Sequence, residues 1–286
     1  MGVGWHMKPG SPRAWMYSPN ASPEPLPKVA WLHNMSSIFP ISTDKDFTIG
    51  DANKEIDRER VTKWVGSHTI IGKKGESLGS IDEWLSNNSK TPMSERMMLI
   101  VPGELGNPYR LADIGITDLP IIPIRMDGIC RTYTDVMDGR EIQPGVHHIT
   151  LARSKGWWEK TQLAFPDKNQ ARKMSEWINN GRGTNWLWQT LDEGIISIGN
   201  DLELESPSRE MLEWDGEEEW IEKAAPSISG PLINLNDITV FLHTRQGIYN
   251  HRGRIARCVH YPQRAFHLEL YRRGSATQWD AAINTK

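Results

Sequence analysis

The chain has 286 residues and a formal net charge of −3, so no overall positive charge draws it toward nucleic acid or an anionic membrane. Cys130 and Cys258 lie far apart without a CxxC spacing, which argues against a disulfide framework or a cysteine-based zinc site and favours a reducing compartment. Because no apolar run approaches the roughly 18 residues of a membrane span and no secretory leader is evident, we expect a cytoplasmic protein without a transmembrane segment.

The amino-terminal segment is rich in proline. Residues 1–28 hold six prolines among Ser, Gly and Asn, which is incompatible with a helix or a central strand and predicts an extended arm. An arm of this kind that is held in place favours assembly. We expect four further divisions: a β/α module at 29–90, a central β-rich module with a carboxy-terminal helix at 91–182, an acidic tryptophan-rich connector at 183–236, and a basic antiparallel meander plus a carboxy-terminal helix at 237–286.

Three short helix candidates recur roughly 100 residues apart, each with one tryptophan and each after a β-like stretch. They are residues 80–88, 173–180 and 275–284. The pattern predicts a mainly β or α+β protein of two or three small antiparallel β modules, each closed by a short carboxy-terminal helix. The shape is analogous to that of pleckstrin-homology modules, and no motif of that family accompanies it. A true repeat and a chance echo in a chain with 13 Trp both remain open.

The best-defined helix lies in the middle of the chain. Asp167 followed by Gln170 has the spacing of a capping box, and Asn180-Gly181 is a typical end. Between them, an apolar face is spaced for one side of a helix. It consists of Ala171, Met174, Trp177 and Ile178.

The sequence predicts that the last fifty residues form a meander of three strands. We expect strands at 238–242, 255–260 and 266–271, with a turn at 250–253. In the third, apolar side chains at 266, 268 and 270 alternate with polar ones. The acidic segment that precedes the meander is expected to form a short helix plus a loop.

Charge is divided between two adjacent blocks. Residues 201–223 carry ten Asp/Glu against two basic residues, a balance of −8, and residues 243–273 carry seven Arg against Glu269, a balance of +6. Opposed blocks of this kind each suit a partner of the other sign, including the other block on a neighbouring copy. The acidic docking surface is predicted to comprise Glu213, Trp214, Asp215, Glu217, Glu218, Glu219 and Trp220. The basic surface is predicted to comprise Arg245, Tyr249, Arg252, Arg254, Arg257, Tyr261, Arg264, Arg272 and Arg273.

The basic block supports two hypotheses. In the first, it pairs with the acidic residues of this chain or of a copy, which the near cancellation of the two charges favours. In the second, its arginines and interleaved tyrosines bind nucleic acid or an anionic phosphoinositide headgroup, with Arg on phosphate and rings stacking on bases.

One motif points to catalysis. His148-Ile-Thr150-Leu151 resembles one half of the paired His-x-Thr/Ser signature of 2H phosphoesterases, which implies an imidazole general base or acid and a phosphate-binding hydroxyl. None of the other eight histidines has Ser or Thr two positions later, so the second half is missing.

We found no sequence pattern for a metal or cofactor. His243, His251, His260 and His267 cluster in the predicted meander, but they follow no metal-site spacing and lie among arginines that repel cations. No phosphate-binding glycine loop or nucleophile elbow is present. The sequence therefore favours a non-enzymatic interaction or structural protein that self-associates through its arm, tryptophan anchors and opposed charges. Nucleic-acid or phosphoinositide binding is the first alternative, and a 2H-like phosphodiesterase centred on His148 is the second.

Overall fold

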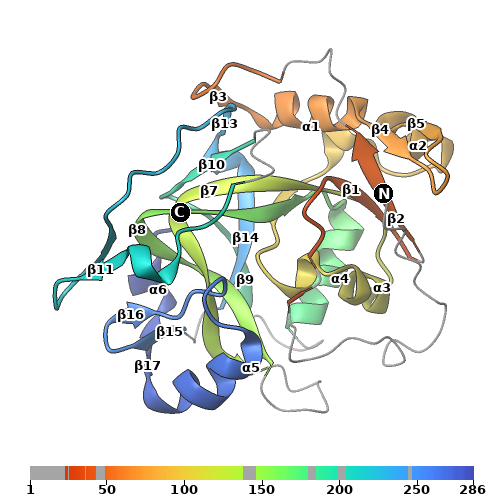
Figure 1. The fold of residues 1–286 in the computed structure, drawn as a ribbon. Helices are drawn as coiled ribbons and strands as arrows, with labels where there is room; N and C mark the ends of the chain where they lie inside the picture. Colours follow the sequence, from red (N-terminus) through yellow and green to blue (C-terminus); the bar gives the residue numbers. More distant parts are fainter. Residues whose placement is uncertain are drawn as a thin grey trace.

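The structure is a computed structural model that describes residues 23–24, 26–35, 37–42, 49–137, 146–179, 185–198, 204–243 and 247–286. Within these residues, fifteen strands join in one mixed sheet and two more form a separate hairpin (Figure 1). The expectation of a mainly β protein is confirmed. The arrangement in small antiparallel modules is not, because the sheet is large and continuous.

The strands have the following bounds: β1 Trp31–Asn34, β2 Ser37–Ser42, β3 Glu55–Ile56, β4 Thr69–Ile71, β5 Ser77–Ser80, β6 Met98–Ile100, β7 Thr117–Met137, β8 His147–Ala164, β9 Trp186–Thr190, β10 Ile195–Ser197, β11 Leu212–Trp214, β12 Glu219–Ile221, β13 Leu232–Ile233, β14 Ile238–His243, β15 Gly247–His251, β16 Arg254–Ile255 and β17 Ser275–Gln278. The α-helices are α1 Arg58–Ser67, α2 Ile81–Asn87, α3 Pro108–Ile114, α4 Lys168–Ile178, α5 Gln263–Ala265 and α6 Trp279–Ala282.

The long antiparallel pair β7–β8 organises the sheet. One edge of β7 pairs with β8 along most of its length, and the other edge meets β1, then β10, then β15 in succession. Pro123 lies between the stretches of β7 that pair with β1 and β10. Because proline has no N–H to donate, it is tolerated where that edge lacks a ladder partner.

Helices cover both faces of the sheet. On one face, α1 and α2 pack against alternate strand residues such as Met98, Ile100 and Ile122. On the other, α3 and α4 pack against the intervening residues Leu99 and Ile121. The period of two along the strands thus produces two apolar cores on opposite sides of one sheet.

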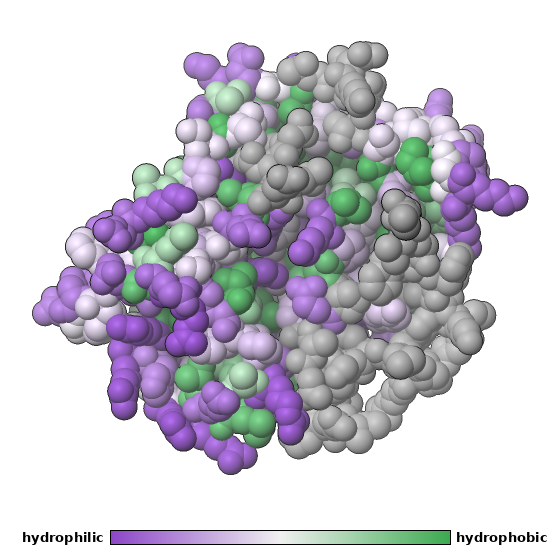
Figure 2. Space-filling view, in the orientation of Figure 1, coloured by the Kyte–Doolittle hydropathy of each residue, from purple (hydrophilic) through white to green (hydrophobic). Residues whose placement is uncertain are grey.

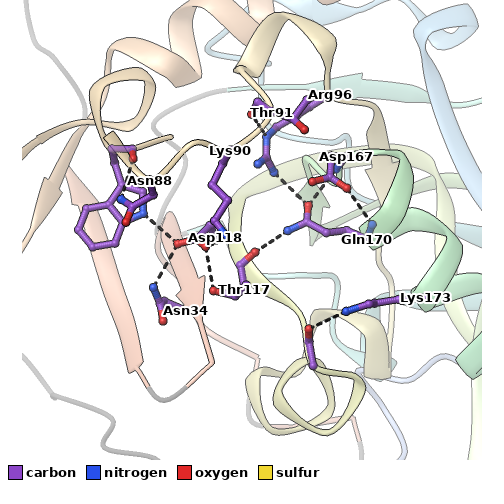
Figure 3. A network of polar contacts seen from close by, with 12 residues as sticks. Asn34, Asn88, Lys90, Thr91, Arg96, Thr117, Asp118, Asp167, Gln170 and Lys173 are labelled. Atoms are coloured by element: carbon purple, nitrogen blue, oxygen red, sulfur yellow. Dashed lines mark hydrogen bonds and ion pairs between the residues drawn. The ribbon is translucent and has the colours of Figure 1, made fainter. Parts of the chain in front are cut away.

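Local sequence signals set the helix starts. Asp167 and Gln170 form the predicted capping box of α4, which is confirmed, and Ser80 with Glu83 forms a second one at α2. In Figure 3, a polar network joins these two helices to the sheet. Its centre is Asp118, whose carboxylate accepts hydrogen bonds from Trp84 Nε1 at 3.0 Å and Asn34 Nδ2 at 3.1 Å.

The network is buried and charged. Burial opposes ionisation of Asp118, but hydrogen bonds from Trp84, Thr117 and Lys90 outweigh it and lower the pKa of that carboxyl. Beside it, the fully buried Arg96 donates to Gln170 Oε1 at 3.0 Å (Figure 3). Arg96 also donates to the Phe165 carbonyl at 2.9 Å. The network therefore has a structural role, fixing α2 and α4 against β7.

Two predictions for the carboxy-terminal region are wrong. Residues 266–271 are helical, with a π-helix at Phe266–Leu270 following α5, because Phe266 and Leu270 lie one helical turn apart and Leu268 stays exposed. Residues 275–278 form β17 on β15 rather than helix, which leaves only α6 after it. The predicted strand at 255–260 is reduced to β16, while the strand at 238–242 is confirmed as β14.

Every predicted division after the arm contributes at least one strand to the same sheet, for example β1, β7, β10 and β14. The division into modules therefore stays a prediction. The arm lies outside the described residues up to Ser22. Across the described part of the chain, no helix has both the length and the apolar character that crossing a membrane requires.

Candidate interaction surfaces

Residues 212–221 of the acidic block form a hairpin, in which Asp215 and Gly216 make a turn between β11 and β12. The predicted short helix is reduced to one 3-10 turn at Arg209–Met211, and the predicted loop around the tryptophans is instead this pair of strands. Asp215 Oδ1 accepts from the backbone N–H groups of Glu217 and Glu218, each at 2.8 Å, and Gly216 adopts φ +110°. Figure 1 shows β11 projecting at the left edge of the molecule. We call residues 211–222 the acidic hairpin.

The inner face of the acidic hairpin packs on the body of the protein. Leu212 and Ile221 lie against the apolar cluster that contains Trp157 and Ile248. On the same face, Glu219 forms an ion pair with Arg257 in which both side chains are at least nine-tenths buried. The two charge blocks therefore meet within one chain.

Aromatic rings complete this intramolecular contact. The Arg257 guanidinium lies 4.6 Å from the Trp157 ring centroid and donates to Ser154 Oγ at 2.8 Å. Arg254 lies over the Trp214 ring at 5.5 Å. Arginine on an indole face is a cation–π arrangement, so this chain pairs its arginines with both carboxylate and tryptophan.

The outer face of the acidic hairpin has the same chemistry and faces solvent. Glu213 and Trp220 are directly opposite each other in the hairpin register. Trp220 is 57% exposed, and Glu213 is exposed with the turn residues Asp215, Glu217 and Glu218. An indole this exposed and ringed by carboxylates suits a cationic side chain such as arginine.

The predicted basic residues divide into buried and exposed groups. Arg257 is buried in its ion pair, and Arg245 lies outside the described residues. Five arginines are exposed in the turn between β15 and β16, on β16 and in the helical segment that follows: Arg252, Arg254, Arg264, Arg272 and Arg273. We call them the basic surface. Figure 2 shows hydrophilic residues gathered on the side that carries β11 and at the lower end, where β15 and β17 lie.

The tyrosines are not placed for base stacking. Tyr249 is 2% exposed, and its hydroxyl accepts from the Gly274 N–H. Tyr261 is half-buried with Arg209 over its ring at 4.8 Å, a contact across 52 residues that no sequence signal marked. The basic surface therefore offers guanidinium groups but not the free rings that the nucleic-acid alternative needs. That alternative stays a prediction.

His148 lies in a closed site. Its Nδ1 is 3.1 Å from Glu104 Oε2, both residues are at most 5% exposed, and Thr150 is buried on the same strand. The adjoining cavity measures about 20 Å³, room for roughly one water molecule. His148 and His243 each make an edge contact with the Trp186 ring. A phosphodiester does not fit this cavity, so the 2H-like alternative stays a prediction that the geometry does not favour.

The four histidines of the carboxy-terminal region separate in space. His267 Nδ1 is 3.1 Å from His147 Nε2, whereas His260 contacts the Pro207 carbonyl. Burial and the nearby Arg272 and Arg264 lower the pKa of His267. In the part of the chain described, no group of three or more His, Cys, Asp or Glu side chains is arranged to hold a metal ion.

Comparison of the chain with protein-family models, with curated proteins and with solved structures found no match.

Proposed function

We propose that this protein functions by binding copies of itself, the outer face of the acidic hairpin of one copy docking on the basic surface of the next. The observation that carries the proposal is the exposed Trp220 beside Glu213. Buried aromatic and arginine anchors dominate the energy of protein interfaces, and an isolated exposed tryptophan among carboxylates is a ready anchor.

The intramolecular contact supports the choice of partner. On the inner face, Trp214 and Glu219 already bind Arg254 and Arg257. The outer face repeats the pair of residue types with Trp220 and Glu213. Exposed arginines of the same chain are therefore the complementary chemistry, and the two blocks keep opposite charges after the buried Glu219–Arg257 pair is set aside.

The contact joins two different surfaces and is therefore heterologous. Such contacts build a ring when the rotation closes and a filament when it does not. The proposal therefore includes a role as a structural component of a larger assembly. Surfaces of opposite charge also accelerate encounter at low salt.

Measurement of molar mass by light scattering tests the proposal. Between about 0.05 M and about 0.5 M salt, the mass should fall toward that of one chain, because screening weakens exposed charge pairs. The double variant Trp220→Ala/Glu213→Gln should have the mass of a single chain at low salt. A parent protein that is a monomer at low salt and high concentration, or a variant that assembles as the parent does, contradicts the proposal.

A further inference from the structure

A pocket of about 300 Å³ lies between the acidic hairpin and the strand β16. Leu212 and Glu219 line it from the hairpin, and Arg254 and Ile255 line it from β16. Both β11 and β16 lie on the left side of the molecule in Figure 1. This volume is at the lower end of the range for small-molecule sites, so the pocket suits a small ligand.

Aromatic rings hold two of the pocket's arginines in place. The Arg209 guanidinium lies 4.8 Å from the Tyr261 ring centroid, and the Arg254 guanidinium lies 5.5 Å from the Trp214 ring centroid. Within the described part of the chain, neither guanidinium has a hydrogen bond or an ion pair. A guanidinium stacked on a ring keeps the N–H groups of its own plane available, and these groups match the oxygens of an oxyanion.

A third arginine of the pocket, Arg257, is buried. Its two terminal nitrogens bind Glu219 and Ser154, whereas its Nε has no hydrogen-bond partner among the described residues. A buried N–H group without an acceptor is costly, and an oxyanion is the kind of ligand that supplies an acceptor.

The charges that line the pocket sum to a positive value. Glu219 is neutralised by Arg257 in their buried ion pair. Of the other lining residues, Arg209 and Arg254 carry +2 and Glu210 carries −1, which leaves a balance of +1. The pocket therefore favours an anion, although it also contains a carboxylate.

Two lining residues are hydrogen-bond acceptors. His260 Nε2 donates to the Pro207 carbonyl at 2.8 Å, so Nδ1 of the neutral ring is an acceptor, and burial lowers the pKa of this histidine. The exposed carboxylate of Glu210 is the second acceptor. Acceptors bind hydroxyl groups, so the pocket matches a ligand that has hydroxyl groups as well as an anionic group.

We infer that this pocket binds the phosphate group of a small phosphomonoester that carries hydroxyl groups. Arg209 and Arg254 donate to the phosphate oxygens, and their two charges match the charge of a phosphate group near −2. A membrane surface presents many phosphates at once and would also meet the exposed carboxylates of the acidic hairpin, whereas a small ligand enters the pocket alone. The inference does not rest on the proposed function, because Arg209 is not part of the basic surface.

Isothermal titration calorimetry with glycerol phosphate tests the inference on the full chain. Glycerol phosphate should bind at one site per chain, and glycerol, which lacks the phosphate, should give no heat of binding. Arg209→Gln should weaken the binding of glycerol phosphate about ten-fold or more, because it removes a charged donor of the phosphate. The control Arg172→Gln removes the same charge from an exposed position on α4 outside the pocket and should bind as the parent does.

A second variant, Arg254→Gln, removes the guanidinium on the other ring and should weaken binding by a similar factor. Inorganic phosphate should bind more weakly than glycerol phosphate, because it lacks the hydroxyl groups. Vesicles that contain phosphatidylinositol phosphate should not sediment the chain. No binding of glycerol phosphate at millimolar concentration, equal affinity in the parent and Arg209→Gln, equal affinity for inorganic phosphate, or sedimentation with the vesicles overturns the inference.

The inference and the proposed function fail separately. Trp220→Ala/Glu213→Gln should bind glycerol phosphate as the parent does, because neither residue lines the pocket. A chain that binds glycerol phosphate but is a monomer at low salt contradicts only the self-association. A chain that assembles at low salt but does not bind glycerol phosphate contradicts only the inference.

Discussion

At the scale of single residues, the most consequential feature is the buried ion pair between Glu219 and Arg257. Its side chains are 9% and 3% exposed, and it joins the acidic hairpin to the body of the protein. A buried pair adds little net stability compared with apolar residues, but removing one partner leaves the other charge uncompensated. The pair is therefore sensitive to loss of either member.

We predict that Glu219→Ala lowers the free energy of unfolding by about 3 kcal/mol, because Arg257 then stays buried without its ion-pair partner. Urea denaturation followed by tryptophan fluorescence measures the change. Glu176→Ala is the control, since its pair with Arg172 is exposed at both side chains and should matter by less than about 1 kcal/mol. Equal denaturation midpoints for the two variants would show that the buried pair is energetically silent.

A second residue-scale prediction concerns pH. Burial lowers the pKa of His33 from 6.5 to about 3, so the folded state resists a proton that the unfolded state accepts below pH 6.5. The neutral ring contributes stability above about pH 6.5, and that contribution is lost as the pH falls toward the folded pKa. Between pH 6.5 and 5, His33→Phe should reduce the loss of unfolding free energy by about 2 kcal/mol. Urea titrations at several pH values check this, and an unchanged pH slope in the variant would refute it.

At the scale of elements, the sequence predicted those features whose signal lies within a few neighbouring residues. The capping box of α4 spans only four residues, and the sequence alone predicted its position. The alternation at 266–271 fits a strand and a helix equally well, because Phe266 and Leu270 share a face in both. Exposure of Leu268 separates the two, and exposure depends on the tertiary fold. Asp215-Gly216 was an available turn signal that the density of glutamates obscured.

The contact between Gly253 and the acidic hairpin gives a prediction at the scale of elements. Gly253 has φ +80°, and a Cβ there would collide with the Trp214 ring. Gly253→Ala should therefore displace Trp214 and loosen the acidic hairpin, seen as faster amide hydrogen exchange over residues 211–222. Gly75→Ala is the matched control, because φ is +85° but nothing lies within 4 Å of the added Cβ. Both variants should incur the left-handed strain of about 1 kcal/mol, and only the first should open the hairpin. Equal protection of the hairpin in both would refute the contact.

At the scale of the whole molecule, contacts between residues far apart in the chain determine features that the sequence alone did not predict. The charge blocks were visible in the composition, but which carboxylate meets which arginine depends on how β12 and β16 dock. Glu104 near His148 and Glu159 near Arg131 are likewise contacts across tens of residues that carry no local mark. The outward position of Trp220 and the inward position of Trp214 follow from strand alternation once the hairpin is known.

A head-to-tail contact predicts complementation between two defective copies. Trp220→Ala/Glu213→Gln lacks the hairpin anchor, and Arg272→Gln/Arg273→Gln lacks part of the basic surface, so each alone should have the mass of one chain at low salt. Mixed in equal amounts, they should form a dimer and nothing larger, because each copy retains one intact surface and the two intact surfaces differ. Sedimentation velocity resolves these species. The control Lys63→Gln/Lys73→Gln removes the same charge from exposed positions outside the basic surface and should assemble as the parent does. If the mixture stays monomeric, or if the basic-surface variant assembles alone, the two surfaces do not bind each other. The exposed Trp220 then binds a different protein.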